Sequence, residues 1–76
     1  MTQSFSSTLH RQGPWPTCVE KEMTGLQCKR WIHALANDVE IEIIEPMEPV
    51  EMDFQVNRVR IFVNETGYVI EIPERG

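Results

Sequence analysis

The chain has 76 residues, of which 41% are hydrophobic and 25% charged, so we expect one small globular domain without room for a deep catalytic cleft. Its formal net charge of −5 argues against a nucleic-acid partner, because binding phosphates needs a clustered basic face. No apolar run is long enough to span a bilayer, so we expect no membrane partner.

The first segment, residues 1–13, is polar and has no hydrophobic periodicity. We therefore expect a flexible tail, followed by a single domain over residues 14–76. The tail lacks the apolar core of a secretory signal, which predicts either a cytoplasmic protein or the processed form of a secreted one. Order is expected to begin where Pro14 and Pro16 fix an extended path and Trp15 anchors on the core.

A capped helix is predicted next. Thr24 and Gln27 have the spacing of a capping box, and Asn37 with Asp38 is a plausible stop. The apolar stripe of this helix consists of Cys28, Trp31, Ile32 and Leu35.

The two cysteines, Cys18 and Cys28, are too few for a disulfide framework or for a zinc site with four thiolates. They could form a disulfide with each other, or they could be two small buried hydrophobic residues. Their spacing leaves both alternatives open.

Two strands with a long loop between them follow the helix. Residues 39–44 alternate β-branched and acidic side chains, and residues 58–63 place Val59, Ile61 and Val63 on one face. Pro46 and Pro49 disfavour regular structure in residues 45–55, so we expect an exposed loop, which at this length is usually functional. Residues 64–67 predict a turn, and residues 68–72 predict a last strand. The order predicts an α+β domain with a single helix packed on a small sheet.

A resemblance to a known family is carried by Trp15 and Pro16, the capped helix, and residues 49–53, 57–63 and 72–76. The resemblance is to the potato inhibitor I family of serine-protease inhibitors. It implies a helix on a mixed sheet, with the long loop joining two parallel strands and binding a serine protease. Because the chain also shows no nucleophile–base pair, phosphate loop or zinc cluster, we expect no enzyme, no catalytic residues, no cofactor and no metal.

The resemblance also implies roles for residues of the loop. Met52 enters the protease specificity pocket, and Met52–Asp53 is the bond offered for cleavage. Arg58 and Arg60 reach back from the second strand and hold the loop. The remaining residues expected to contact the protease are Pro49, Val50, Glu51, Phe54 and Gln55.

Met52 bears on the choice of target protease. It is long, flexible and apolar, so it suits the hydrophobic pockets of chymotrypsin-like and subtilisin-like enzymes. It offers no cation to the buried acid of a trypsin-type pocket, so trypsin is expected to be a poor target.

Two residues of the loop depart from the family pattern. Glu51 stands where the family usually has threonine, so two carboxylates, Glu51 and Asp53, flank Met52 and repel each other unless both arginines engage. Gln55 stands where the family often has arginine, so we expect one brace fewer. The alternatives to an inhibitor are a non-inhibitory member of the fold that binds a protein partner through its acidic loop, and a simple cleavable substrate. We expect a monomer.

Overall fold

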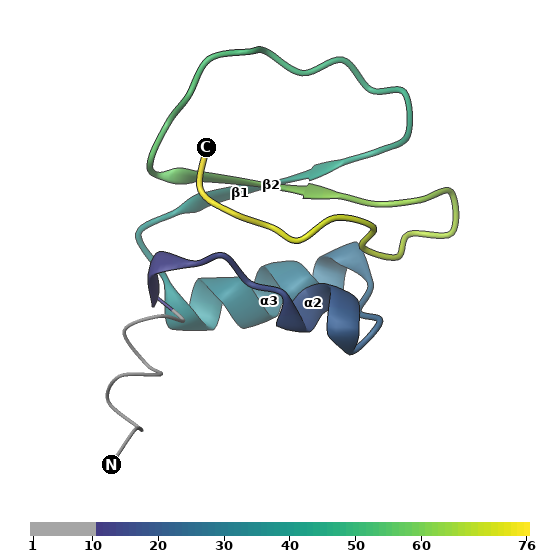
Figure 1. The fold of residues 1–76 in the computed structure, drawn as a ribbon, viewed down its shortest axis with the longest axis horizontal. Helices are drawn as coiled ribbons and strands as arrows, with labels where there is room; N and C mark the ends of the chain where they lie inside the picture. The colour runs from purple at the N-terminus through teal and green to yellow at the C-terminus, as the bar shows by residue number, and fades with distance from the viewer. Residues whose placement is uncertain (1–10) are drawn as a thin grey trace.

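The computed structural model describes residues 11–76, so most of the expected tail lies outside the described part. The helices are α2 (Thr17–Glu20) and α3 (Gly25–Leu35), and the strands are β1 (Glu40–Ile44) and β2 (Arg58–Phe62). Figure 1 shows both helices on one side of the two strands and a long loop arching away on the other side. This loop, residues 45–57, joins the end of β1 to the start of β2, and we call it the binding loop.

Helix α3 begins as the sequence predicts. The Thr24 side chain accepts a hydrogen bond from the Gln27 N–H at 3.2 Å, and the Gln27 side chain accepts one from the Thr24 N–H at 3.0 Å. This reciprocal capping satisfies two N–H groups that the first turn leaves without partners. The helix ends at Leu35, after which the Ala36 N–H still donates to the Ile32 carbonyl.

The start of α3 packs directly on the sheet because Gly25 has no side chain. A Cβ atom at this position would lie 2.9 Å from the Val63 Cγ1 and 3.2 Å from the Ile43 Cγ2. The Gly25 N–H also donates to the Gly67 carbonyl at 2.8 Å. A glycine at the first helical residue therefore lets the helix approach the end of β2.

Strands β1 and β2 pair in parallel, as the family resemblance implies. The register places Glu40 opposite Arg58 and Glu42 opposite Arg60. Val59 and Ile61 alternate with these arginines and are fully buried in the core below the sheet. The two-residue period of a strand therefore directs the arginines to the opposite side, toward the binding loop.

The core joins both ends of the described chain. Trp15 is completely buried, and its N–H donates to the Pro73 carbonyl at 2.9 Å. Cys18 of α2 and Cys28 of α3 are joined by a buried disulfide. The tryptophan and the disulfide fix the N-terminal segment against the C-terminal one and against the main helix.

The strand predicted over residues 68–72 is not formed. This segment makes only isolated antiparallel bridges, from Tyr68 to Thr24 and from Val69 to Val63. Ile70 and Ile72 are about half exposed, so the alternating apolar residues do not create a buried face. Helix α2 was not predicted, because four residues are too few to show a helical period.

Candidate functional site

The binding loop presents its side chains to solvent. Met52 is 95% exposed and Phe54 is 73% exposed. Pro49, Glu51 and Gln55 are exposed as well, while Val50 is half-buried. Since monomeric proteins usually cover large apolar side chains together, an exposed methionine and phenylalanine two residues apart indicate a contact surface.

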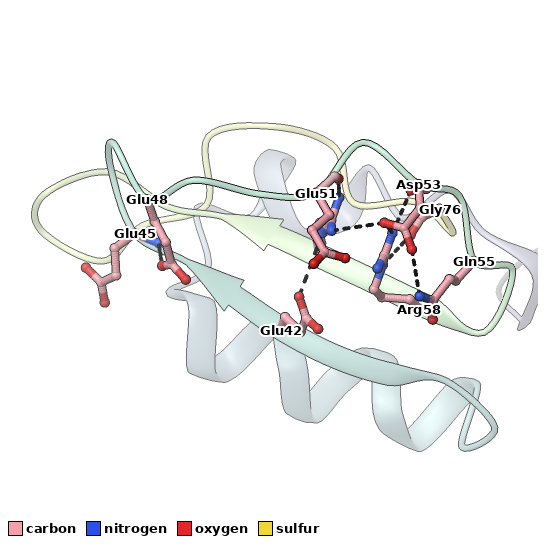
Figure 2. Close-up of polar contacts among 9 residues, drawn as sticks. Glu42, Glu45, Glu48, Glu51, Asp53, Gln55, Arg58 and Gly76 are labelled. Carbon is pink, nitrogen blue, oxygen red and sulfur yellow. Dashed lines mark hydrogen bonds and ion pairs between the residues drawn. The ribbon is translucent and has the colours of Figure 1, made fainter.

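Arg58 holds the loop at Asp53. Its side chain is 6% exposed, and its Nη2 donates to the Asp53 carbonyl at 2.8 Å and lies 3.2 Å from the Asp53 Oδ1. Its Nε donates to the backbone oxygen of Gly76 at 2.8 Å, and the Gly76 N–H donates back to the Arg58 carbonyl. Figure 2 shows this guanidinium between the loop and the C-terminal segment. One buried cation thus connects β2, the loop and Gly76.

Arg60 holds the loop on the other side of Met52. Its Nη1 donates to the Glu51 carbonyl at 2.8 Å, and its Nη2 lies 3.9 Å from the Asp53 Oδ1. Its Nε forms a longer ion pair, 3.7 Å, with the Oε1 of Glu42 on β1. The cross-strand register of Glu42 and Arg60 creates this pair, so β1 helps to orient the arginine.

The Asp53 carboxylate is also bound by Gln55, whose Nε2 donates to Oδ2 at 2.8 Å. Gln55, which was expected to leave the loop with one brace fewer, thus supports Asp53 from within the loop. Hydrogen bonds from Gln55 and then Arg58 hold the pKa of Asp53 below its ordinary value, because both favour the charged form. The side-chain amide of Gln55 therefore gives Asp53 a hydrogen-bond donor that remains uncharged at every pH.

Glu51 is bound through its backbone, not its side chain. Its carbonyl accepts the Arg60 bond, whereas its carboxylate forms no hydrogen bond or ion pair within residues 11–76. The repulsion expected between Glu51 and Asp53 is reduced because both arginines reach the loop and Arg58 pairs with the Asp53 carboxylate. The loop is thus braced without the hydroxyl group that threonine would supply.

The first arm of the loop contains a turn that the sequence did not reveal. The Glu48 carboxylate accepts a hydrogen bond from the Glu45 N–H at 2.9 Å, and the Glu48 N–H donates to the Glu45 carbonyl at 3.1 Å. Met47, between them, is fully exposed and has a φ of 65°, a value that favours glycine. Glu48 therefore shapes the loop and is not simply a solvated acid.

Sequence reasoning missed four contacts in and around the loop: Glu42 with Arg60, Gln55 with Asp53, Gly76 with Arg58, and Arg75 with Val56. The acidic residues that alternate along β1 and the arginines that alternate along β2 indicate cross-strand ion pairs, but the register of the two strands is needed to pair Glu42 with Arg60. Within the described residues, no group of three or more His, Cys, Asp or Glu side chains could hold a metal ion. None of the helices described is long and apolar enough to cross a membrane.

Comparisons with known proteins show which family the chain is similar to. A model of the potato inhibitor I family matches residues 7–76. An inhibitor of trypsin and Hageman factor from Cucurbita maxima is 39% identical over 62 residues, which cover 82% of this chain and 88% of the relative.

Two solved structures are also similar. The bitter gourd trypsin inhibitor has 34% identity and a TM-score of 0.75, with 82% of this chain and 88% of that chain covered. The solution structure of Cucurbita maxima trypsin inhibitor-V has 38% identity and a TM-score of 0.56, covering 72% and 81%. These matches confirm the predicted α+β fold and the expectation that the chain is not an enzyme. The chain belongs to the potato inhibitor I family and is a serine-protease inhibitor.

Proposed function

We propose that the chain inhibits serine proteases with an apolar specificity pocket by offering the Met52–Asp53 bond as a substrate-like bait. One observation carries the proposal. Met52 is 95% exposed, while the carbonyl before it, on Glu51, and the carbonyl after that bond, on Asp53, each accept a hydrogen bond from an arginine of β2. The exposed side chain is therefore presented by a backbone fixed on both sides.

A fixed backbone is what separates an inhibitor from a substrate. An extended segment docks on a protease through backbone hydrogen bonds, and a flexible one loses conformational freedom when it does so. Arg58 and Arg60 impose that order before binding, with donors whose rigid fork suits carbonyl and carboxylate oxygens. The affinity gained through this preorganisation favours a persistent complex.

Met52 sets the expected target class. A thioether side chain fills an irregular apolar pocket, as in chymotrypsin-like and subtilisin-like enzymes, and supplies no positive charge to an acidic pocket. The similar inhibitors from Cucurbita and bitter gourd are named as trypsin inhibitors. This chain is proposed to share their scaffold and to differ in the protease that it prefers.

The test is a titration of chymotrypsin, subtilisin and trypsin with the purified protein, combined with mass spectrometry of each mixture over several hours. We expect stoichiometric inhibition of the first two, slow cleavage at Met52–Asp53 alone, and weak inhibition of trypsin. Met52→Gly should weaken inhibition by about ten- to a hundredfold, because it removes an apolar side chain worth roughly 1.5–3 kcal/mol when buried.

Met47→Gly is the matched control. Met47 lies in the same loop, is fully exposed, and has a φ that glycine adopts readily, so this variant should inhibit like the parent chain. Equal inhibition by the Met52→Gly variant and by the parent protein would refute the assignment of Met52 as the bait residue. Rapid cleavage with recovery of protease activity would instead identify a substrate, and binding that weakens steeply with salt would favour docking through the acidic loop.

A further inference from the structure

A third arginine, Arg75, forms hydrogen bonds with three other segments of the chain, one of which is the binding loop. Its Nη1 donates to the Val56 carbonyl at 3.0 Å and to the Asp38 Oδ2 at 3.1 Å. Its Nη2 donates to the Arg11 carbonyl at 2.9 Å and lies 3.3 Å from the Asp38 Oδ1. The arginine side chain is 13% exposed, and its Nε has no hydrogen-bond partner.

Asp38 fixes the direction of this guanidinium. The carboxylate follows α3 and precedes β1, so it belongs to the rigid part of the fold. It receives both terminal nitrogens of Arg75 in a forked arrangement, which adds geometric definition to the ion pair. Arg75 itself is held by its backbone, which bridges to Val59 of β2. The donor to Val56 is thus fixed from two sides.

Val56 lies in the part of the loop that follows the Met52–Asp53 bond. We call residues 53–57 the leaving arm, because cleavage would free its N-terminus while its other end stays attached to β2. Arg58 holds the first residue of this arm at Asp53, and Arg75 holds it three residues later at Val56. Val56 is 58% exposed, so its side chain contributes little packing to keep the arm in place.

The chemistry of the bait bond explains why the position of this arm matters. Hydrolysis breaks the bond between the Met52 carbonyl carbon and the Asp53 nitrogen, and water supplies a hydroxyl to the carbon and a proton to the amine. Religation reverses each change through an ester to the protease serine. The serine attacks the Met52 carboxyl carbon and water leaves; the Asp53 amine then attacks the same carbon, the ester bond breaks, the serine takes back a proton from the amine, and the peptide bond re-forms. The rate of religation depends on how often the amine lies within reach, and holding reactants in place can change such rates by orders of magnitude.

We propose that Arg75, oriented by Asp38, is a positioning residue for the leaving arm and keeps the freed Asp53 amine close to the acyl carbon. This inference rests on the proposed bait bond. It predicts a defect in religation and not in the first encounter with the protease, because neither Arg75 nor Asp38 lies beside Met52 in the loop.

The experiment begins with the parent protein, for which inhibition and cleavage at Met52–Asp53 are established first. The cleaved protein is then purified, and its religation by catalytic amounts of the same protease is followed by mass spectrometry. Arg75→Gln should slow religation by about tenfold and raise the equilibrium ratio of cleaved to intact protein by a similar factor, since it removes a charged hydrogen bond to the leaving arm. The association rate should change less than twofold.

Asp38→Asn keeps the Arg75 bond to Val56 while removing the ion pair, so it should give a smaller shift in the same direction. Arg30→Gln is the matched control, because it removes the same charge from the exposed face of α3, where Arg30 forms no ion pair with described residues. Denaturant unfolding of each variant separates a general loss of stability from the specific effect.

The outcomes distinguish the two proposals. If the parent chain is not cleaved at Met52–Asp53, the proposed bait bond fails whatever the variants do. If the parent behaves as proposed while Arg75→Gln and Asp38→Asn religate at the parent rate, the positioning role is overturned. The role is also overturned if both variants lose stability but keep the parent ratio of cleaved to intact protein.

Discussion

Replacing Arg58 by methionine tests how much of the inhibitor's strength comes from bracing the loop. Methionine fills a similar volume in the buried site but donates no hydrogen bond. The change removes two bonds to backbone oxygens, on Asp53 and Gly76, and the ion pair with the Asp53 carboxylate. Because Arg58 lies on β2 below the loop, the substitution leaves the exposed Met52 side chain itself unchanged.

The magnitude follows from these contacts. Each backbone bond to a charged donor contributes about 1.5 kcal/mol at the lower end of the usual range. The ion pair adds little, because the Asp53 side chain is 44% exposed and water screens it. The two backbone bonds together contribute about 3 kcal/mol, which corresponds to weaker inhibition by roughly two orders of magnitude.

Arg60→Met provides the internal comparison. Arg60 donates one bond to a backbone oxygen of the loop, on Glu51, and its two ion pairs are long, at 3.7 and 3.9 Å. Its loss should weaken inhibition by only about tenfold. Inhibition constants for one apolar-pocket protease, measured beside denaturant unfolding, provide the assay. This account of the bracing would be refuted if Arg60→Met inhibited the protease more weakly than Arg58→Met, or if both variants inhibited it as strongly as the parent protein.

Two further predictions concern stability. Gly25→Ala should destabilise the fold by about 1–3 kcal/mol despite the better helix propensity of alanine, because the new methyl group would meet Val63 at 2.9 Å. Thermal unfolding measures this change, and a variant more stable than the parent would contradict the close packing of Gly25. The pKa of Asp53 is lower in the folded protein than in the unfolded chain. The contribution of Asp53 to the free energy of unfolding is therefore complete above the unfolded pKa near 3.8, and it is lost as the pH falls through the folded pKa. Asp53→Asn should therefore flatten the acid dependence of the urea midpoint, and an unchanged dependence would count against the Arg58 and Gln55 contacts.

The main elements of the fold were predictable because each has a strong local pattern. The capping box of α3 and the alternation in β1 and β2 are properties of a few neighbouring residues, and the structure contains them at the expected places. The last segment shows the limit of this reasoning. Residues 68–72 alternate like a strand, but their backbone pairs with other segments only at isolated positions. The alternating pattern therefore predicted a strand that the structure does not form.

The site was predictable in part for a related reason. Met52, Arg58 and Arg60 stand in a recognisable order along the chain, whereas the partners of the loop come from distant segments. Gly76 is 18 residues from Arg58, and Arg75 is 19 residues from Val56, so neither contact follows from local spacing. The contact of Gln55 was not predicted because only the absence of an arginine was considered, and not the hydrogen bond that the Gln55 amide donates to Asp53.

The acidic character of the loop has a consequence for how it is held. The hydrogen bonds that hold the backbone on either side of Met52 do not depend on the carboxylates of the loop. Arg60 reaches the Glu51 carbonyl, and Arg58 reaches the Asp53 carbonyl as well as its side chain. Protonating Asp53 therefore removes only part of the bracing and leaves both carbonyl contacts in place. Because Arg58 and Arg60 hold the backbone carbonyls of Asp53 and Glu51, the bracing on either side of Met52 does not require the Glu51 side chain.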